Sequence, residues 1–251
     1  MRIKRGGAAM ALILAGIIMF GGSLAQGAIG FALGLIAAPL LVEAGFSLSQ
    51  AVALTTLSIG IQVMFGAWQL RAHIPWDDVK PAAIVRFLTV ALGVLLLLNV
   101  EAMDAVGVKR LAGVGVLLGV IARVLAGRVM QREWPKAATI AAFSLSGVLQ
   151  GLLAMGGPPL VLWMTTRDFR AQEARAFTMT LFLLNAPVQV LLLLFLSQTM
   201  SLEVILMALA LSPLIYIGTM IGVRIGDRFS KQLLNRAALA VLVAIALNAI
   251  F

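Results

Sequence analysis

Long stretches without a charged residue are the feature that most limits how this chain can fold. The longest of them extend from Gly6 to Val42, Ala44 to Leu70, Ala137 to Thr166, Ala176 to Leu202 and Val204 to Val223. A helix that crosses a bilayer needs about 20 apolar residues, and each stretch reaches or exceeds that length. Apolar and polar residues do not alternate over strand-length windows, which argues against a membrane β-barrel. The sequence therefore predicts an all-α integral membrane protein.

The composition supports this class. Only 12% of the residues are charged, about half the share usual in soluble domains. The net charge of +9 comes from basic residues in short loops, which indicates cytoplasmic loops and anionic lipid headgroups as neighbours rather than nucleic acid. The sequence has no cysteine and one histidine, His73, so thiol chemistry and cysteine-ligated metals are excluded. No cofactor or metal is expected.

Eight apolar segments divide the chain. They cover about 8–42, 48–70, 79–100, 106–126, 136–166, 174–197, 203–223 and 232–251. The first and fifth are too long for one straight crossing. The start of the chain also resembles a secretory signal with a cleavage site after Ala25, but the apolar run continues past that point, so we expect this segment to be retained.

The two long segments both contain a glycine-rich interruption. The first runs from Ser23 to Gly34 and leads to Pro39, and the second runs from Ser146 to Leu160. Glycine and proline weaken or end helices, and unwound backbone survives in a membrane only where protein or a wet cavity satisfies its polar groups. Two such interruptions in corresponding halves are typical of a transporter binding site. We expect broken or re-entrant helices at segments one and five.

The two halves of the sequence resemble each other. Gln26-Gly27 matches Gln150-Gly151, and Pro39-Leu40 matches Pro159-Leu160. The prediction is one membrane domain, 1–251, with two homologous halves of about four apolar segments, 8–127 and 136–251, and a linker at 128–135. Basic loops favour re-entrant hairpins at both interruptions and inverted halves, but this arrangement places the basic N-terminus outside, against the positive-inside rule. Spanning and re-entrant segments therefore both stay open.

Several polar residues interrupt the apolar segments and have two interpretations. The threonines, Gln62 and Asn185 could join helices by hydrogen bonds or line a ligand path. Arg86, about two turns into its segment, could snorkel to the interface or face an anion path. The glycines at 218, 222 and 226 predict close helix packing.

The glycine-rich stretches from Gly27 to Leu41 and from Gly151 to Leu160 resemble the paired signatures of the TauE/SafE family of sulfite and organosulfur anion exporters. The resemblance covers almost the whole chain, although Ala32 and Leu33 stand where that family often has further glycine. It implies a plasma-membrane permease of the bacterial type that moves small anions such as sulfite, sulfonates or related carboxylates.

The predicted function is therefore a secondary transporter of small anions. A membrane-embedded enzyme and an accessory subunit are the alternatives; the first lacks a visible catalytic set, and the second does not explain two matched interruptions. The expected partners are a small anionic solute and the lipid bilayer, with a homodimer left open. The candidate substrate-binding residues are Gln26, Gly27, Gly30, Gly34, Pro39, Thr55, Thr56, Gln62, Gln150, Gly151, Gly156, Gly157, Pro158, Pro159, Thr178 and Asn185.

Overall fold

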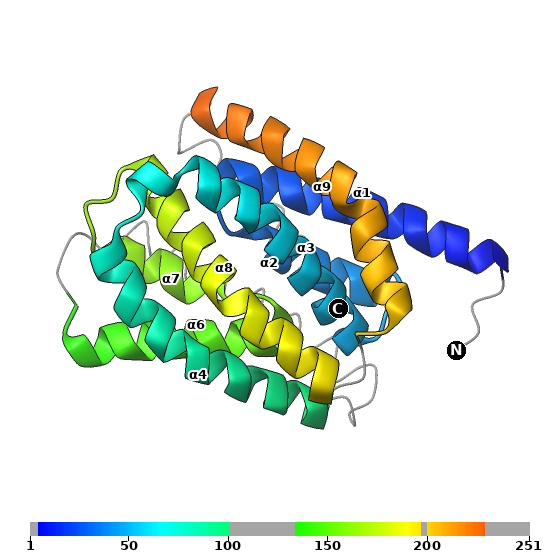
Figure 1. Cartoon of the computed structure of the whole chain (residues 1–251), viewed down its shortest axis with the longest axis horizontal. Coiled ribbons are helices and arrows are strands. Elements are labelled where there is room, and N and C mark those ends of the chain that lie inside the picture. The colour runs from blue at the N-terminus through cyan, green and yellow to red at the C-terminus, as the bar shows by residue number, and fades with distance from the viewer. Residues whose placement is uncertain (1–4, 101–133, 197–199, 229–251) are drawn as a thin grey trace.

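The computed structural model describes residues 5–100, 134–196 and 200–228 (Figure 1). The helices are α1 (Arg5–Ile29), α2 (Ala32–Glu43), α3 (Leu48–Gln69), the short η1 (Arg71–His73), α4 (Trp76–Val100), α6 (Lys136–Leu153), α7 (Gly157–Met164), α8 (Ala171–Leu196) and α9 (Leu202–Arg228). The predicted segments 106–126 and 232–251, and residues 128–133 of the predicted linker 128–135, lie outside the described residues.

Six of these helices are long and apolar enough to cross a membrane: α1, α3, α4, α6, α8 and α9. Their outward side chains are apolar, and Ile84, Leu88 and Phe195 are 70%, 70% and 74% exposed. Many polar side chains, in contrast, are buried between the helices. A surface of this kind suits lipid rather than water. The predicted all-α membrane class is confirmed.

Two helices fold back directly after they end. Helix α1 ends at Ile29 and α2 begins at Ala32, and a methyl group placed on Gly22 would lie 3.5 Å from the Leu33 Cα atom. Helix α6 ends at Leu153 and α7 begins at Gly157, and a methyl group on Gly156 would lie 2.8 Å from the Ser146 carbonyl oxygen. At neither place does the chain continue in the direction of the helix that has just ended.

Each reversal contains one residue with a left-handed backbone. Gly30 has a φ of 104°, and Ala154 has a φ of 57°. Glycine adopts this region without a steric penalty, whereas alanine does so at a cost of about 1–2 kcal/mol. The second reversal therefore holds a strained residue that the first does not.

Helices α1, α3 and α4, from the first part of the chain, pack mainly against α6, α8 and α9, from the second part. Helix α1 lies along α9, and α4 lies along α6, while α3 and α8 cross between these pairs (Figure 1). Glycines permit the close approach: a methyl group on Gly222 would lie 2.1 Å from the Leu24 carbonyl oxygen, and one on Gly93 would lie 2.3 Å from that of Val148. The predicted role of the glycines at 218, 222 and 226 in close helix packing is confirmed.

Helices α3 and α8 run antiparallel through the middle of the molecule (Figure 1). Gly60 lies near Ala186, and Gly66 lies against the side chain of Met179. Residue numbers therefore increase along α3 in the direction in which they decrease along α8. The start of α3 is fixed by a capping box, in which Ser47 and Gln50 each accept the other's backbone N–H group. This cap satisfies backbone donors that a helix start leaves unpaired.

Candidate functional site

The two chain reversals meet each other. A methyl group on Gly34 would lie 1.8 Å from the carbonyl oxygen of Ala154, and one on Gly157 would lie 3.0 Å from the Cβ atom of Phe31. Phe31 and Ala154 are as far apart in the sequence as Gly34 and Gly157. The contact is therefore reciprocal, because each reversal touches the equivalent start of the other's short helix.

A buried glutamine closes each reversal in the same way. The Oε1 atom of Gln26 accepts the backbone N–H group of Leu33 at 2.9 Å, and the Oε1 atom of Gln150 accepts that of Gly156 at 3.1 Å. Backbone N–H groups at the start of a helix have no partner within the helix. Each glutamine supplies one, and so holds the short helix against the long one.

The remaining amide atoms of these two glutamines differ. Gln150 donates from Nε2 to Oε1 of Gln189 at 3.1 Å, and Gln189 donates back to the Gln150 carbonyl oxygen at 2.8 Å. The Nε2 atom of Gln26 has no hydrogen-bond partner among the described residues, although Gln26 is fully buried. The first reversal therefore keeps a donor that the second has already used.

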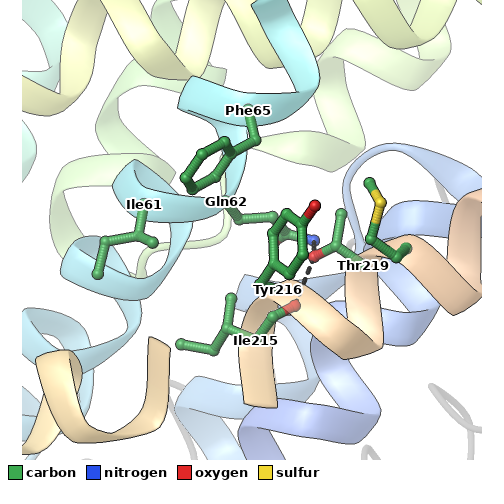
Figure 2. A pocket seen from close by; sticks show the side chains of 7 residues that line it. Ile61, Gln62, Phe65, Ile215, Tyr216 and Thr219 are labelled. Atoms are coloured by element: carbon green, nitrogen blue, oxygen red, sulfur yellow. Dashed lines mark hydrogen bonds between the residues drawn. The ribbon is translucent and has the colours of Figure 1, made fainter. Parts of the chain in front are cut away.

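Gln62 connects α3 to both α1 and α9. Its Nε2 atom donates to the Ser23 carbonyl oxygen at 3.1 Å and to the Thr219 hydroxyl oxygen at 2.8 Å. Gln62 and Thr219 line a small hollow between α3 and α9, together with apolar side chains and Tyr216 (Figure 2). The wall of this hollow is mostly apolar, so it offers few groups to a charged solute.

Arg86 of α4 lies beside the second reversal and is 0% exposed. Its Nη1 atom donates to the Ser146 hydroxyl oxygen, and this hydroxyl donates to the Gly156 carbonyl oxygen. The Phe182 ring lies under the guanidinium group, with its centroid 5.4 Å from Cζ. The Nε and Nη2 atoms have no hydrogen-bond partner among the described residues.

All of the residues that the sequence singled out as substrate-binding are buried. Most of those at the reversals come together, whereas Gly30 lies against Arg175 of α8; the ones that come together are Gln26, Gly34, Gln150, Gly156 and Gly157. Others have a packing role in this structure, since Gly27 and Gly151 lie against the backbones of α9 and α4, and Thr178 donates to the Ala174 carbonyl oxygen at 2.9 Å.

The candidate prolines and hydroxyl groups are placed differently from one another. Pro158 and Pro159 stand in the first turn of α7, where a missing N–H group is tolerated, whereas Pro39 lies inside α2. The hydroxyl oxygens of Thr55 and Thr56 have no hydrogen-bond partner within the described ranges. Asn185 donates to the Leu181 carbonyl oxygen at 2.8 Å, within its own helix.

The candidate set from the sequence omitted four buried residues that lie at the centre. Ser146 and Arg86 contact the second reversal, Gln189 pairs with Gln150, and Thr219 pairs with Gln62. A signal existed for Arg86, because a charge within an apolar run is costly unless it has a function. Ser146 carried none, because serine also occurs in helix contacts.

Replacing Ala154 with glycine is expected to raise the stability of the protein by up to about 1 kcal/mol, because glycine removes the left-handed strain at this position. The measurement is the midpoint of thermal unfolding in detergent, compared with the wild type. Ala186→Gly serves as a control, because residue 186 lies inside α8, where glycine is expected to lower the midpoint. A lower midpoint for Ala154→Gly would show that the φ of 57° carries no strain.

Apolar helices with lipid-facing surfaces and a buried polar centre define a multi-pass membrane protein of the transporter class. The family model described as "Sulfite exporter TauE/SafE" matches residues 14–249, so the chain belongs to the TauE/SafE family. This is a family of transporters and not of enzymes, and in bacteria it resides in the plasma membrane.

One relative is similar over most of its length. The chain is 26% identical over 228 residues to a protein of Cupriavidus necator named "Probable sulfite/organosulfonate exporter TauE", and the match covers 89% of this chain and 88% of the relative. No solved structure matches the chain.

Proposed function

We propose that this protein is a secondary transporter that moves sulfite, organosulfonates or closely related small anions across the plasma membrane. The family and the name of the Cupriavidus relative support an anion of this kind. The observation that carries the proposal is the meeting of the two chain reversals, where Gly34 touches Ala154 and Gly157 touches Phe31. Transporters bind solutes where interrupted helices face each other near the bilayer centre.

The protein consists, in this proposal, of two homologous halves with opposite orientation, 8–127 and 136–251. Corresponding helices run in opposite directions, as α3 and α8 do where Gly60 meets Ala186. The reciprocal contact between the two reversals supports the same relation. Both α2 and α7 return beside the helix that precedes them, which supports re-entrant hairpins at segments one and five.

The solute binds, in this proposal, beside the reversals, and buried donors without partners support this position. The Nε2 atom of Gln26 and the hydroxyl groups of Thr55 and Thr56 are buried without hydrogen-bond partners in the part of the chain that the structure describes. A buried donor without a partner costs about 1–3 kcal/mol. An anion offers such donors the acceptors they lack, and nearby helix starts favour negative charge.

Transport follows from motion of one packed group of helices against the other. Helix α1 contacts both α2 and α9, helix α6 contacts both α4 and α7, and α3 and α8 lie between these groups. Rocking of one group relative to the other exposes the centre first to one side of the membrane and then to the other, as in other transporters with inverted halves.

The proposal predicts that small oxyanions stabilise the purified protein and cross membranes that contain it. Sulfite, methanesulfonate, thiosulfate, sulfate and acetate are each added to the protein in detergent, and the unfolding midpoint is measured. A ligand at 100 times its dissociation constant adds about 2.7 kcal/mol of stability. The same anions are then tested for flux into proteoliposomes, with protein-free vesicles as the control. Absence of both a shift and a flux for every anion would contradict the proposed function.

A further inference from the structure

Arg86 carries a positive charge in the apolar interior without a negative partner. Its side chain is 0% exposed, and no carboxylate among the described residues forms an ion pair with it. The effective penalty for burying one ion is several kcal/mol. Charged residues inside membrane segments therefore mark solute or ion pathways where they lack a partner in the protein.

The contacts of the guanidinium group leave one edge free. Nη1 donates to Ser146, and the Phe182 ring covers one face. The two atoms without partners in the described ranges are Nε and Nη2. These two atoms carry parallel N–H groups along one side of the planar guanidinium, which is a geometry that matches two oxygens of a carboxylate or phosphate. A spherical halide ion offers these two donors only one acceptor atom, so it matches them less well than two oxygens do.

Ser146 holds this edge in place beside the second reversal. Its hydroxyl oxygen accepts the N–H group of Arg86 Nη1 and donates to the Gly156 carbonyl oxygen. Gly156 itself is bound through its N–H group by Gln150. The guanidinium is therefore connected to the same backbone that closes the reversal, and its orientation depends on that reversal.

The position equivalent to Arg86 beside the other reversal carries no charge. Gly151 lies against the Val90 carbonyl oxygen and the Val94 nitrogen, and Gly27 lies in the same way against Thr219 and Val223. One turn before Val90 is Arg86, and one turn before Thr219 is Ile215. Ile215 lines the largely apolar hollow of Figure 2. The two sides of the centre therefore differ at this position. The arginine beside the first reversal is Arg175 of α8, whose Cγ atom would lie 3.4 Å from a methyl group on Gly30 and whose Nε atom donates to the Ala171 carbonyl oxygen of its own helix.

We propose that the free edge of Arg86 binds two oxygens of one oxyanion, such as a sulfonate, sulfite or carboxylate, and selects it over halide ions. This inference rests on the proposed transport function and assigns its charged anchor. One anion binds per chain, on the side of the second reversal. Arg86 is the residue that gives the site its preference for an anion with two oxygens on one edge.

The test uses Arg86→Met, which removes the charge, and Arg86→Lys, which keeps the charge and removes the edge. Binding of methanesulfonate, acetate and chloride is measured as the ligand-induced shift of the unfolding midpoint, and flux is measured in proteoliposomes. Arg86→Met is expected to lose both the shift and the flux. Arg86→Lys is expected to bind methanesulfonate about tenfold more weakly or worse, with less discrimination against chloride. Arg71→Met, at an exposed arginine that contacts Trp68, is expected to behave as the wild type.

The unfolding midpoint of the ligand-free protein distinguishes a binding role for Arg86 from a structural one. Removing an unpaired buried charge is expected to leave the unfolding midpoint of Arg86→Met unchanged or to raise it. A lowered midpoint with an intact methanesulfonate shift, or failure of both variants to fold, would overturn the inference in favour of a structural role. If the wild type neither binds nor transports any anion, the proposed function fails. If the wild type binds and transports anions and both Arg86 variants do so equally well, the inference about Arg86 fails while the proposed function stands.

Discussion

Gly34→Ala is expected to leave little folded protein in the membrane. The new methyl group would lie 1.8 Å from the carbonyl oxygen of Ala154 and 2.9 Å from its carbonyl carbon. Both are backbone atoms at a residue whose φ of 57° is already strained, so they cannot move aside cheaply. Overpacking a dense interior costs about 1–3 kcal/mol and sometimes more, and contact with fixed backbone belongs at the upper end.

The measurement for Gly34→Ala is the yield of monodisperse protein on size exclusion and its unfolding midpoint. Gly21→Ala is the matched control, because a methyl group on Gly21 meets nothing within 4 Å. Alanine within a helix is favoured over glycine by up to about 1 kcal/mol, so this control is expected to equal or exceed the wild type. Equal yield and midpoint for Gly34→Ala and Gly21→Ala would mean that the two reversals do not touch as described.

Gln150→Met is expected to lower stability about twice as much as Gln26→Met, and to stop transport. Loss of the Gln150 amide leaves the N–H group of Gly156 and the Oε1 atom of Gln189 without their partners. Each unpaired buried group costs about 1–3 kcal/mol. Loss of the Gln26 amide leaves only the N–H group of Leu33, because its Nε2 atom has no partner to lose in the described residues.

The comparison is made on unfolding midpoints in detergent and on anion flux in proteoliposomes. Gln69→Met is the control, since Gln69 is exposed at the end of α3, and it is expected to leave both quantities unchanged. A larger loss of stability for Gln26→Met than for Gln150→Met would contradict the hydrogen-bond pattern. Normal flux in both variants would remove the glutamines from the binding site and leave them as structural supports.

The class of the protein could be predicted from the sequence because it depends on run length alone. Uncharged stretches such as Ala44–Leu70 reach the thickness of a bilayer, and no tertiary contact can change that. The packing role of Gly222 was equally accessible, because glycines spaced four apart lie on one helix face. The paired Gln-Gly motifs directed attention to Gln26 and Gln150, which have matching hydrogen bonds in the structure.

The path of the chain after each interruption could not be predicted in the same way. Glycine and proline indicate where a helix weakens, but they do not say whether the next helix continues or returns. That choice depends on contacts such as Gly22 with Leu33, which join residues on two different helices. Pro39 illustrates the limit, because it lies inside α2, whereas Pro158 lies in the first turn of α7.

The importance of Ser146, Gln189 and Thr219 also depends on distant partners. Each is an ordinary polar residue of an apolar helix, and each becomes distinctive only because another helix brings Arg86, Gln150 or Gln62 within hydrogen-bond distance. The charge of Arg86 was visible in the sequence. Its free edge was not, since that edge is defined by the partners of the other guanidinium atoms.

The packing of helices from the first part of the chain against helices from the second part has a consequence for biosynthesis. Helix α1 is among the first to leave the ribosome, but its main neighbour, α9, is made last among the described helices. Until then, the face of α1 at Gly27 that finally rests on Thr219 and Gly222 must border lipid or the insertion machinery. Helix α1 is therefore made early but gains its main contact late, and the native centre forms only after α9 has been made.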